Sequence, residues 1–118
     1  MKVEQPPKRR LVVLNGHRVL QVLAGDDWGI EKVDKARGVR PGLYQLFEAA
    51  EADQSKPTAG IVVHVDDLQV YLQTDAGLVK HDLGAFDRPP PLGGRLTVSY
   101  NRQGRASFDM QPVKSSAR

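Results

Sequence analysis

The sequence contains no cysteine, which excludes disulfides, thiolate metal sites and a cysteine nucleophile. It has no apolar run of about eighteen residues, the length expected of a membrane-spanning helix. Residues 1–10 also lack the apolar stretch of a signal peptide. Aromatic residues are scarce, at 6%, so the core is expected to consist mainly of Val and Leu. Together these absences predict a cytoplasmic protein with an aliphatic core.

A chain of 118 residues is long enough to bury one modest core, which predicts a single domain. The formal net charge of +3 first suggests a nucleic-acid partner. However, the terminal segments hold six of the basic residues against one acid, so 11 basic and 13 acidic residues remain between Leu11 and Met110. We therefore expect a domain over residues 10–110 in which the segment from Leu11 to Met110 carries a charge of −2, which does not favour nucleic acid. Disordered tails are expected at 1–9 and 111–118.

Short runs rich in β-branched residues alternate with turn signals, which predicts an all-β fold. The expected strands are 11–14, 17–23, 28–33, 43–50, 61–65, 68–74, 78–81, 95–100 and 105–110. Asn15-Gly16 predicts a two-residue type I′ hairpin, because both turn residues must take positive φ. The connections at 34–42 and 82–87 are each expected to contain a short helical turn, capped by Asp34 and Asp82.

The order of these features repeats, once over residues 11–50 and again over 60–110. Each half has three strands, a Lys-x-Asp sequence (Lys32-Val-Asp34 and Lys80-His-Asp82), a loop with Pro and Gly, and a fourth strand. The order favours an internal duplication, although two unrelated β-meanders would also look alike. Four short strands bury little surface alone. We therefore expect two similar four-stranded halves packed into a compact SH3-like barrel or sandwich.

Residues suited to catalysis are few. His17, His64 and His81 fall in different expected strands without a metal-binding spacing, and we expect them at the surface or at strand edges. Neither Ser99 nor Ser107 stands in the strand-to-helix turn of a serine nucleophile. The sequence therefore predicts a protein that is not an enzyme, with no catalytic residue, no metal, no cofactor and no small-molecule substrate.

Three groups of residues are candidates for binding a partner. Trp28, the only tryptophan, is either part of the core or an interface anchor. The repeated Lys and Asp share a strand face with Ile30 or Leu78; they either cover apolar surface or form two equivalent binding rims. Four arginines gather around the C-terminal hairpin, where they either protect a sheet edge or bind an anionic partner. The full set of candidates is Trp28, Lys32, Asp34, Lys80, His81, Asp82, Arg88, Arg95, Arg102 and Arg105.

Several segments carry a family resemblance. Residues 60–66, 70–73, 79–82, 86–100 and 104–106, which include Phe86-Asp-Arg-Pro-Pro-Pro-Leu-Gly-Gly94, resemble the KfrB domain of broad-host-range plasmid proteins. Residues 11–21, 32–36 and 40–44 are similar to the N-terminal half of stand-alone members. The likeness covers nearly all of residues 10–110.

This resemblance implies a bacterial accessory factor for plasmid maintenance or conjugative transfer, with no defined catalytic residues. We therefore expect a non-catalytic module that binds a plasmid-encoded protein partner and does not bind a membrane. The alternative is a small β-barrel that binds nucleic acid. The charge of the expected domain favours the first interpretation.

Overall fold

Alternating apolar residues build the N-terminal sheet of the computed structural model, which describes residues 7–110. Its strands are β1 (Arg9–Leu14), β2 (His17–Ala24), β3 (Asp27–Lys35) and β4 (Gly42–Tyr44). They form an antiparallel sheet in the order β3-β2-β1-β4. Asn15 and Gly16, at the turn between β1 and β2, have φ values of 54° and 79°. These positive angles confirm the predicted hairpin.

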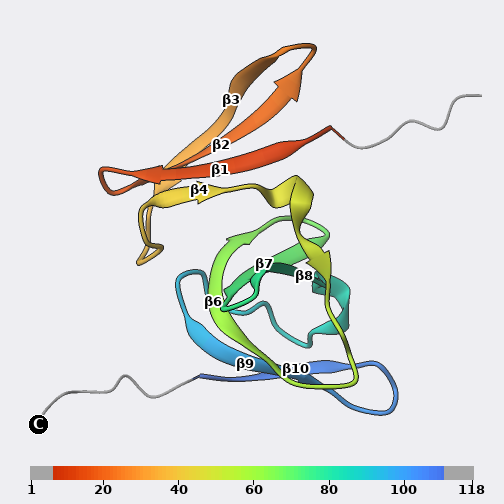
Figure 1. The fold of residues 1–118 in the computed structure, drawn as a ribbon. Coiled ribbons are helices and arrows are strands. Elements are labelled where there is room, and N and C mark those ends of the chain that lie inside the picture. Colours follow the sequence, from red (N-terminus) through yellow and green to blue (C-terminus); the bar gives the residue numbers. More distant parts are fainter. Residues whose placement is uncertain (1–6, 111–118) are drawn as a thin grey trace, which may run out of the picture.

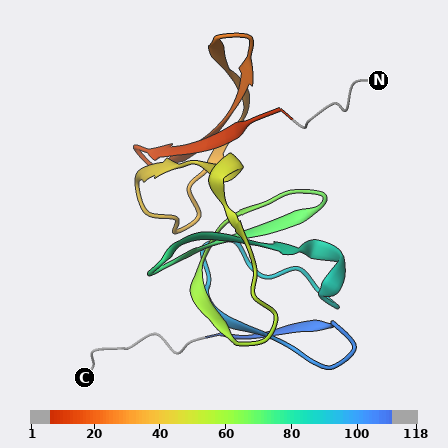
Figure 2. The same cartoon turned by 45° about the vertical axis from the view of Figure 1, so that its right-hand side comes forward.

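The second sheet has six strands in the order β10-β9-β6-β7-β8-β5. The strands are β5 (Ala50–Glu51), β6 (Thr58–Val65), β7 (Gln69–Thr74), β8 (Gly77–Asp82), β9 (Arg95–Tyr100) and β10 (Ala106–Met110). β5 pairs with β8 in parallel, and the other pairs are antiparallel. Figures 1 and 2 show that this sheet curls, and Phe86 closes it through an isolated bridge to Ala106. The predicted all-β class is therefore confirmed, whereas the SH3-like detail stays a prediction.

The two halves share one strand order, as the sequence repeat predicts. In the first half β1, β2 and β3 form a meander, and β4 returns to pair with β1. In the second half β6, β7 and β8 form a meander, and β9 returns to pair with β6. Lys32 and Lys80 both lie in the third strand of their half, Lys32 opposite Leu20 of β2 and Lys80 opposite Tyr71 of β7.

Residues 43–50 do not form the single strand that we expected. β4 ends at Tyr44, a 3₁₀ turn η1 follows at Leu46–Glu48, and β5 joins the other sheet. The side chain of Leu46 explains this break, because it is 4% exposed and belongs to the core between the sheets. A hydrophobic residue buried at this point turns the chain away from β4.

The two connections expected to contain capped helical turns behave differently. Asp34 is still within β3, and the following turn places Arg37 and Gly38 at positive φ without a helix. The second connection does contain a 3₁₀ turn, η2 at Leu83–Ala85, but the side chain of its N-cap residue Asp82 makes no capping hydrogen bond. Both capping predictions were therefore wrong.

Two hydrophobic cores hold the structure together. The first lies within the curled sheet and includes Val62, Leu72 and Leu96, each 0% exposed. The second lies between the sheets, where Leu11 and Val13 of β1 pack in one cluster with Val63 of β6. The inner face of the N-terminal sheet is therefore buried against the C-terminal half, as expected for halves that pack together.

The charge of the folded part differs from the expectation because the chain becomes ordered earlier. Arg9 and Arg10 belong to β1, and the carbonyl of Lys8 accepts a hydrogen bond from Leu23 N at 2.9 Å. Residues 7–110 thus carry 14 basic and 13 acidic residues, a formal charge of +1. The rest of the two predicted tails lies outside the described residues.

Candidate interaction surface

The outer face of the N-terminal sheet is apolar. Val33, Val19, Val12 and Leu43 lie opposite one another across β3, β2, β1 and β4. Because Leu11 and Val13 point inward, Val12 between them points outward. Val33 is 53% exposed and Leu43 is 52% exposed. One row of aliphatic side chains therefore crosses the whole sheet without cover from the rest of the described chain.

Trp28 lies on this outer face. It is half-buried, and its ring centroid lies 6.1 Å from that of Phe47. The Arg10 guanidinium lies 4.1 Å from the Trp28 ring centroid, and Arg10 Nε donates a hydrogen bond of 2.6 Å to Gln21 Oε1. Lys8 Nζ lies 5.2 Å from the Phe47 ring centroid. Cation–π contacts thus hold both rings against the sheet, which makes Trp28 a surface residue fixed in place.

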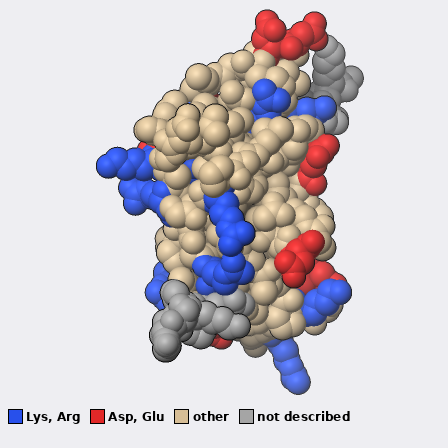
Figure 3. All heavy atoms as spheres, turned by 60° about the vertical axis from the view of Figure 1, so that its left-hand side comes forward, with Lys and Arg blue, Asp and Glu red and all other residues tan. Residues whose placement is uncertain are grey.

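The exposed hydrophobic residues concentrate on this side. Seven large hydrophobic residues are exposed among residues 7–110, and five of them lie on this face or border it: Leu14, Ile30, Val33, Leu43 and Phe47. Figure 3 shows a broad area without charged side chains over the upper part of the molecule, where this sheet lies. Large contiguous apolar patches are rare on monomeric soluble proteins and are typical of interaction sites. We call this surface, together with Val12, Val19 and Trp28, the outer face.

The sequence analysis identified Trp28 but missed the rest of the outer face. A signal was present, because Leu11 to Leu14 is a continuous apolar run. Such runs are typical of strands that place apolar side chains on both faces. One face of β1 packs against the second sheet, and the other forms part of the outer face.

A β-bulge separates Ile30 from Lys32, which we expected on the same face. Ile30 lies opposite Gln21 and Lys32 lies opposite Leu20, with the register shift between these pairs. Since Gln21 and Leu20 point to opposite faces of β2, Ile30 is on the outer face and Lys32 on the inner one. Glu31 is the extra residue in this bulge, and because of it Ile30 and Lys32 do not share a face as predicted.

The first Lys-x-Asp sequence lies at a groove between the sheets, where its charges have partners within the chain. Lys32 Nζ is 3.4 Å from Asp34 Oδ2, which is also 3.7 Å from Arg18 Nη2. In the same groove Arg9 donates two hydrogen bonds to Glu31, at 2.7 and 3.2 Å, and these lower the pKa of the Glu31 carboxyl. These charged groups already interact with one another.

The second Lys-x-Asp sequence has different surroundings. Lys80 Nζ is 3.4 Å from Glu51 Oε2, and Asp82 Oδ1 accepts a hydrogen bond of 3.4 Å from Gln69 Nε2. His81 between them is 2% exposed, with Nδ1 at 2.7 Å from the Tyr100 hydroxyl. Its burial corrects our expectation that His81 contacts a partner. The two Lys-x-Asp sequences thus lie at corresponding strands of the two halves, but their side chains have different neighbours.

Histidine placement was predicted correctly only for His17, which is exposed. His64 is 7% exposed and neither of its ring nitrogens has a hydrogen-bond partner within the described chain. Burial lowers the pKa of His64, and it lowers the pKa of His81 to about 4. Both rings are therefore neutral in the folded protein near neutral pH.

These shifts predict a loss of stability in mild acid. Between the unfolded histidine pKa near 6.5 and the folded value of about 4 for His81, the unfolded chain binds more protons, so stability falls as pH falls. We expect the free energy of unfolding to drop by about 1 to 2 kcal/mol from pH 7.5 to pH 5 through His81. Urea denaturation across this range measures the drop. His81→Gln should flatten the profile and His17→Gln should not; a flat wild-type profile would contradict the assignment.

The four C-terminal arginines do not form one cluster. Arg105 binds the Gly84 carbonyl at 3.0 Å and the Asp87 carboxylate, and the Arg88 guanidinium lies 4.7 Å from the Phe108 ring centroid. Arg102 is exposed in the turn between β9 and β10, whereas Arg95 begins β9 at the other end of the hairpin. The length of β9 therefore separates Arg95 from Arg102, and the predicted grouping of the four arginines was wrong.

Two further findings concern the described part of the chain. Residues 7–110 contain no group of three or more His, Asp or Glu side chains placed to hold a metal ion. No helix among them has the length and apolar character needed to cross a membrane.

Comparison with known proteins places this two-sheet all-β chain in a family. The KfrB domain model matches residues 58–110, which run from β6 to β10. Protein TraB of Escherichia coli is 32% identical over 100 residues, covering 81% of this chain and 68% of TraB. The chain therefore belongs to the family of plasmid-associated KfrB-domain proteins, and the predicted resemblance is confirmed.

Proposed function

We propose that this chain is a non-catalytic docking module that binds a plasmid-encoded protein through the outer face. The uncovered apolar row across β1–β4, with Trp28 held beside it, carries the proposal. We place its role in plasmid maintenance or conjugative transfer in the cytoplasm, in keeping with the family. Burial of apolar area is the main driving force of protein association, and tryptophan is enriched among residues that dominate binding energy.

The charges around the outer face define the chemistry of the partner. Lys8 and Arg10 contact aromatic rings, and neither forms an ion pair with a carboxylate within residues 7–110. A partner with an apolar surface bordered by Asp or Glu would meet both requirements. A nucleic acid would leave the aliphatic row uncovered, because most of its protein contacts go to phosphate and sugar.

The outer face belongs to β1–β4 and η1, which precede the KfrB match at residues 58–110. The alignment with TraB covers 100 residues and so extends beyond that match. The C-terminal sheet is then a scaffold that supports the N-terminal sheet from its inner side.

Replacing Trp28 tests this proposal. Each protein encoded beside this chain for transfer or maintenance is purified and titrated by calorimetry. We expect Trp28→Ala to weaken binding of the cognate partner about 30-fold or more, since a central tryptophan contributes about 2 kcal/mol or more to binding. Leu68→Ala removes an exposed apolar residue away from the outer face and should change affinity less than about twofold.

Thermal melts of both variants separate binding from folding. Trp28 is half-buried, so Leu43→Ala, which removes a more exposed residue of the same face, serves as a second variant. Equal affinity of the folded Trp28→Ala and Leu43→Ala proteins and the wild type would refute the outer face as the docking site. If the wild type self-associates and both variants lose this self-association, the outer face binds a second copy of the chain instead.

A further inference from the structure

A pocket of about 380 Å³ lies between the two sheets and is separate from the outer face. Its walls come from Arg40 and Tyr44 of the first half, and from β6, the β7–β8 turn and Arg95 of the second half. Tyr44 lies opposite Leu11 on the inner side of the N-terminal sheet. Occupation of this pocket is therefore compatible with a partner on the outer face.

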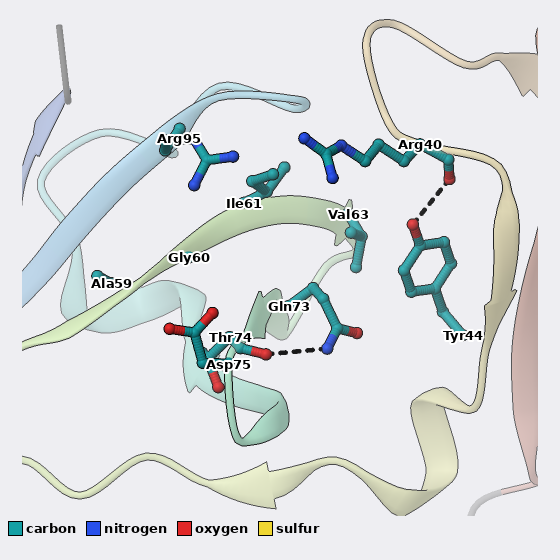
Figure 4. Close-up of a pocket in the computed structure, with 10 residues that line it drawn as sticks. All are labelled: Arg40, Tyr44, Ala59, Gly60, Ile61, Val63, Gln73, Thr74, Asp75 and Arg95. Atoms are coloured by element: carbon teal, nitrogen blue, oxygen red, sulfur yellow. Dashed lines mark hydrogen bonds between the residues drawn. The ribbon is translucent and has the colours of Figure 1, made fainter. Parts of the chain in front are cut away.

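Two arginines from different halves of the chain, Arg40 before β4 and Arg95 at the start of β9, meet at this pocket. Figure 4 shows the guanidinium groups of Arg40 and Arg95 pointing toward each other beside Ile61. Within residues 7–110 neither side chain has a hydrogen-bond or ion-pair partner. Like charges repel, so this arrangement is favourable when an anion lies between them.

The backbone holds both arginines in place. The Tyr44 hydroxyl donates a hydrogen bond of 2.7 Å to the Arg40 carbonyl, and Arg95 is paired with Ile61 in the sheet. Asp75, the one carboxylate among the lining residues, lies with Thr74 on another wall (Figure 4). The pocket thus has a positively charged side and an acidic side.

Further basic residues lie near this pocket. The Gly93 backbone packs closely against that of Arg37, so the loop carrying Arg37 lies near the start of β9. In Figure 3 basic side chains lie along the boundary between the upper and lower parts of this side of the molecule. Local charge, not the net charge, decides whether such a surface attracts a phosphate backbone.

We propose that this pocket binds single-stranded nucleic acid, with one phosphate between Arg40 and Arg95 and a base against the Tyr44 ring. Guanidinium groups bind phosphate oxygens through paired hydrogen bonds, and a phosphate group can engage both arginines at once. The Tyr44 ring borders the pocket (Figure 4), and aromatic rings bind bases by stacking. The volume lies within the range of small-ligand pockets.

Fluorescence anisotropy with the full chain tests the proposal. The probe is a labelled oligothymidylate of about twelve nucleotides, a length within the site sizes of single-strand binders. We expect Arg40→Gln with Arg95→Gln to weaken binding about tenfold or more at low salt. The salt dependence should also become shallower, by a slope of about 0.7 for the one lost phosphate contact on a single strand.

A matched control removes two charges elsewhere. Lys56→Gln with Arg102→Gln lowers the net charge equally and alters exposed residues that do not line the pocket. This control should bind within about twofold of the wild type. Equal weakening in both double variants, or no binding by the wild type, would overturn the proposal. Circular dichroism melts verify folding, and the single variants Arg40→Gln and Arg95→Gln replace the double variant if it is unstable.

Competition distinguishes the class of ligand. Unlabelled oligothymidylate should displace the probe, and poly-glutamate of equal charge should displace it at least tenfold less well, because carboxylates offer no stacking base. Equal displacement by poly-glutamate would reassign the pocket to an acidic protein. Tyr44→Leu provides a separate readout, since it should weaken binding while leaving the salt slope unchanged.

Discussion

Gly93→Ala is expected to lower the free energy of unfolding by about 3 kcal/mol or more. Gly93 has a φ of +81°, and an added Cβ would clash with the Arg37 carbonyl oxygen. Its amide also donates a hydrogen bond of 2.8 Å to the Val62 carbonyl, which fixes the loop to β6. The loop can move away from Arg37 only by disturbing the contact between the halves.

Gly104→Ala is the matched control for this effect. Gly104 has almost the same φ, +80°, with no atom within 4 Å of the added Cβ. It should lose only about 1 to 2 kcal/mol, the cost of the left-handed conformation itself. Urea denaturation measures both variants. Equal losses would mean that the contact between Gly93 and the Arg37 loop does not hold the halves together.

Ile30→Asp with Val33→Asp is expected to abolish partner binding, weakening it about 100-fold or more. Ile30 and Val33 are 66% and 53% exposed, so the free protein should keep its stability within about 1 kcal/mol. In a complex, both carboxylates would be removed from water against an apolar partner surface, at a cost of several kcal/mol. Calorimetric titration measures the loss.

A control with the same charge change tests the specificity of this loss. Gln103→Asp with Ser107→Asp places two carboxylates at exposed positions of the C-terminal hairpin. This variant should bind as the wild type does, because rim charges away from an interface change affinity little. A similar loss in both variants would point to general repulsion, and unaffected binding by the Ile30/Val33 variant would exclude the outer face.

Most of the strand arrangement could be predicted from the sequence because its signals are local. The Asn15-Gly16 turn, the β-branched runs and the repeated order of features all describe neighbours in the chain. By contrast, β5 joins the second sheet and does not continue β4 because of where Leu46 is buried. That contact joins residues distant in sequence, and local propensity does not encode it.

The candidate site was less predictable than the fold. A single bulged residue, Glu31, places Ile30 and Lys32 on opposite faces, and a register shift of this kind leaves no clear pattern in one sequence. His81 is in the core because its strand neighbours enclose it. Arg40 and Arg95 meet only through packing of the two sheets.

Site-specific photocrosslinking tests the docking proposal most directly. A photoreactive amino acid replaces Val33, which lies on β3 and belongs to the outer face, or Ser107 on β10 as the control. In cells carrying the plasmid, the protein labelled at position 33 should crosslink to a plasmid-encoded transfer or maintenance protein identified by mass spectrometry. Position 107 should give no such product. Crosslinks to that protein from position 107 and none from position 33 would contradict docking on the outer face.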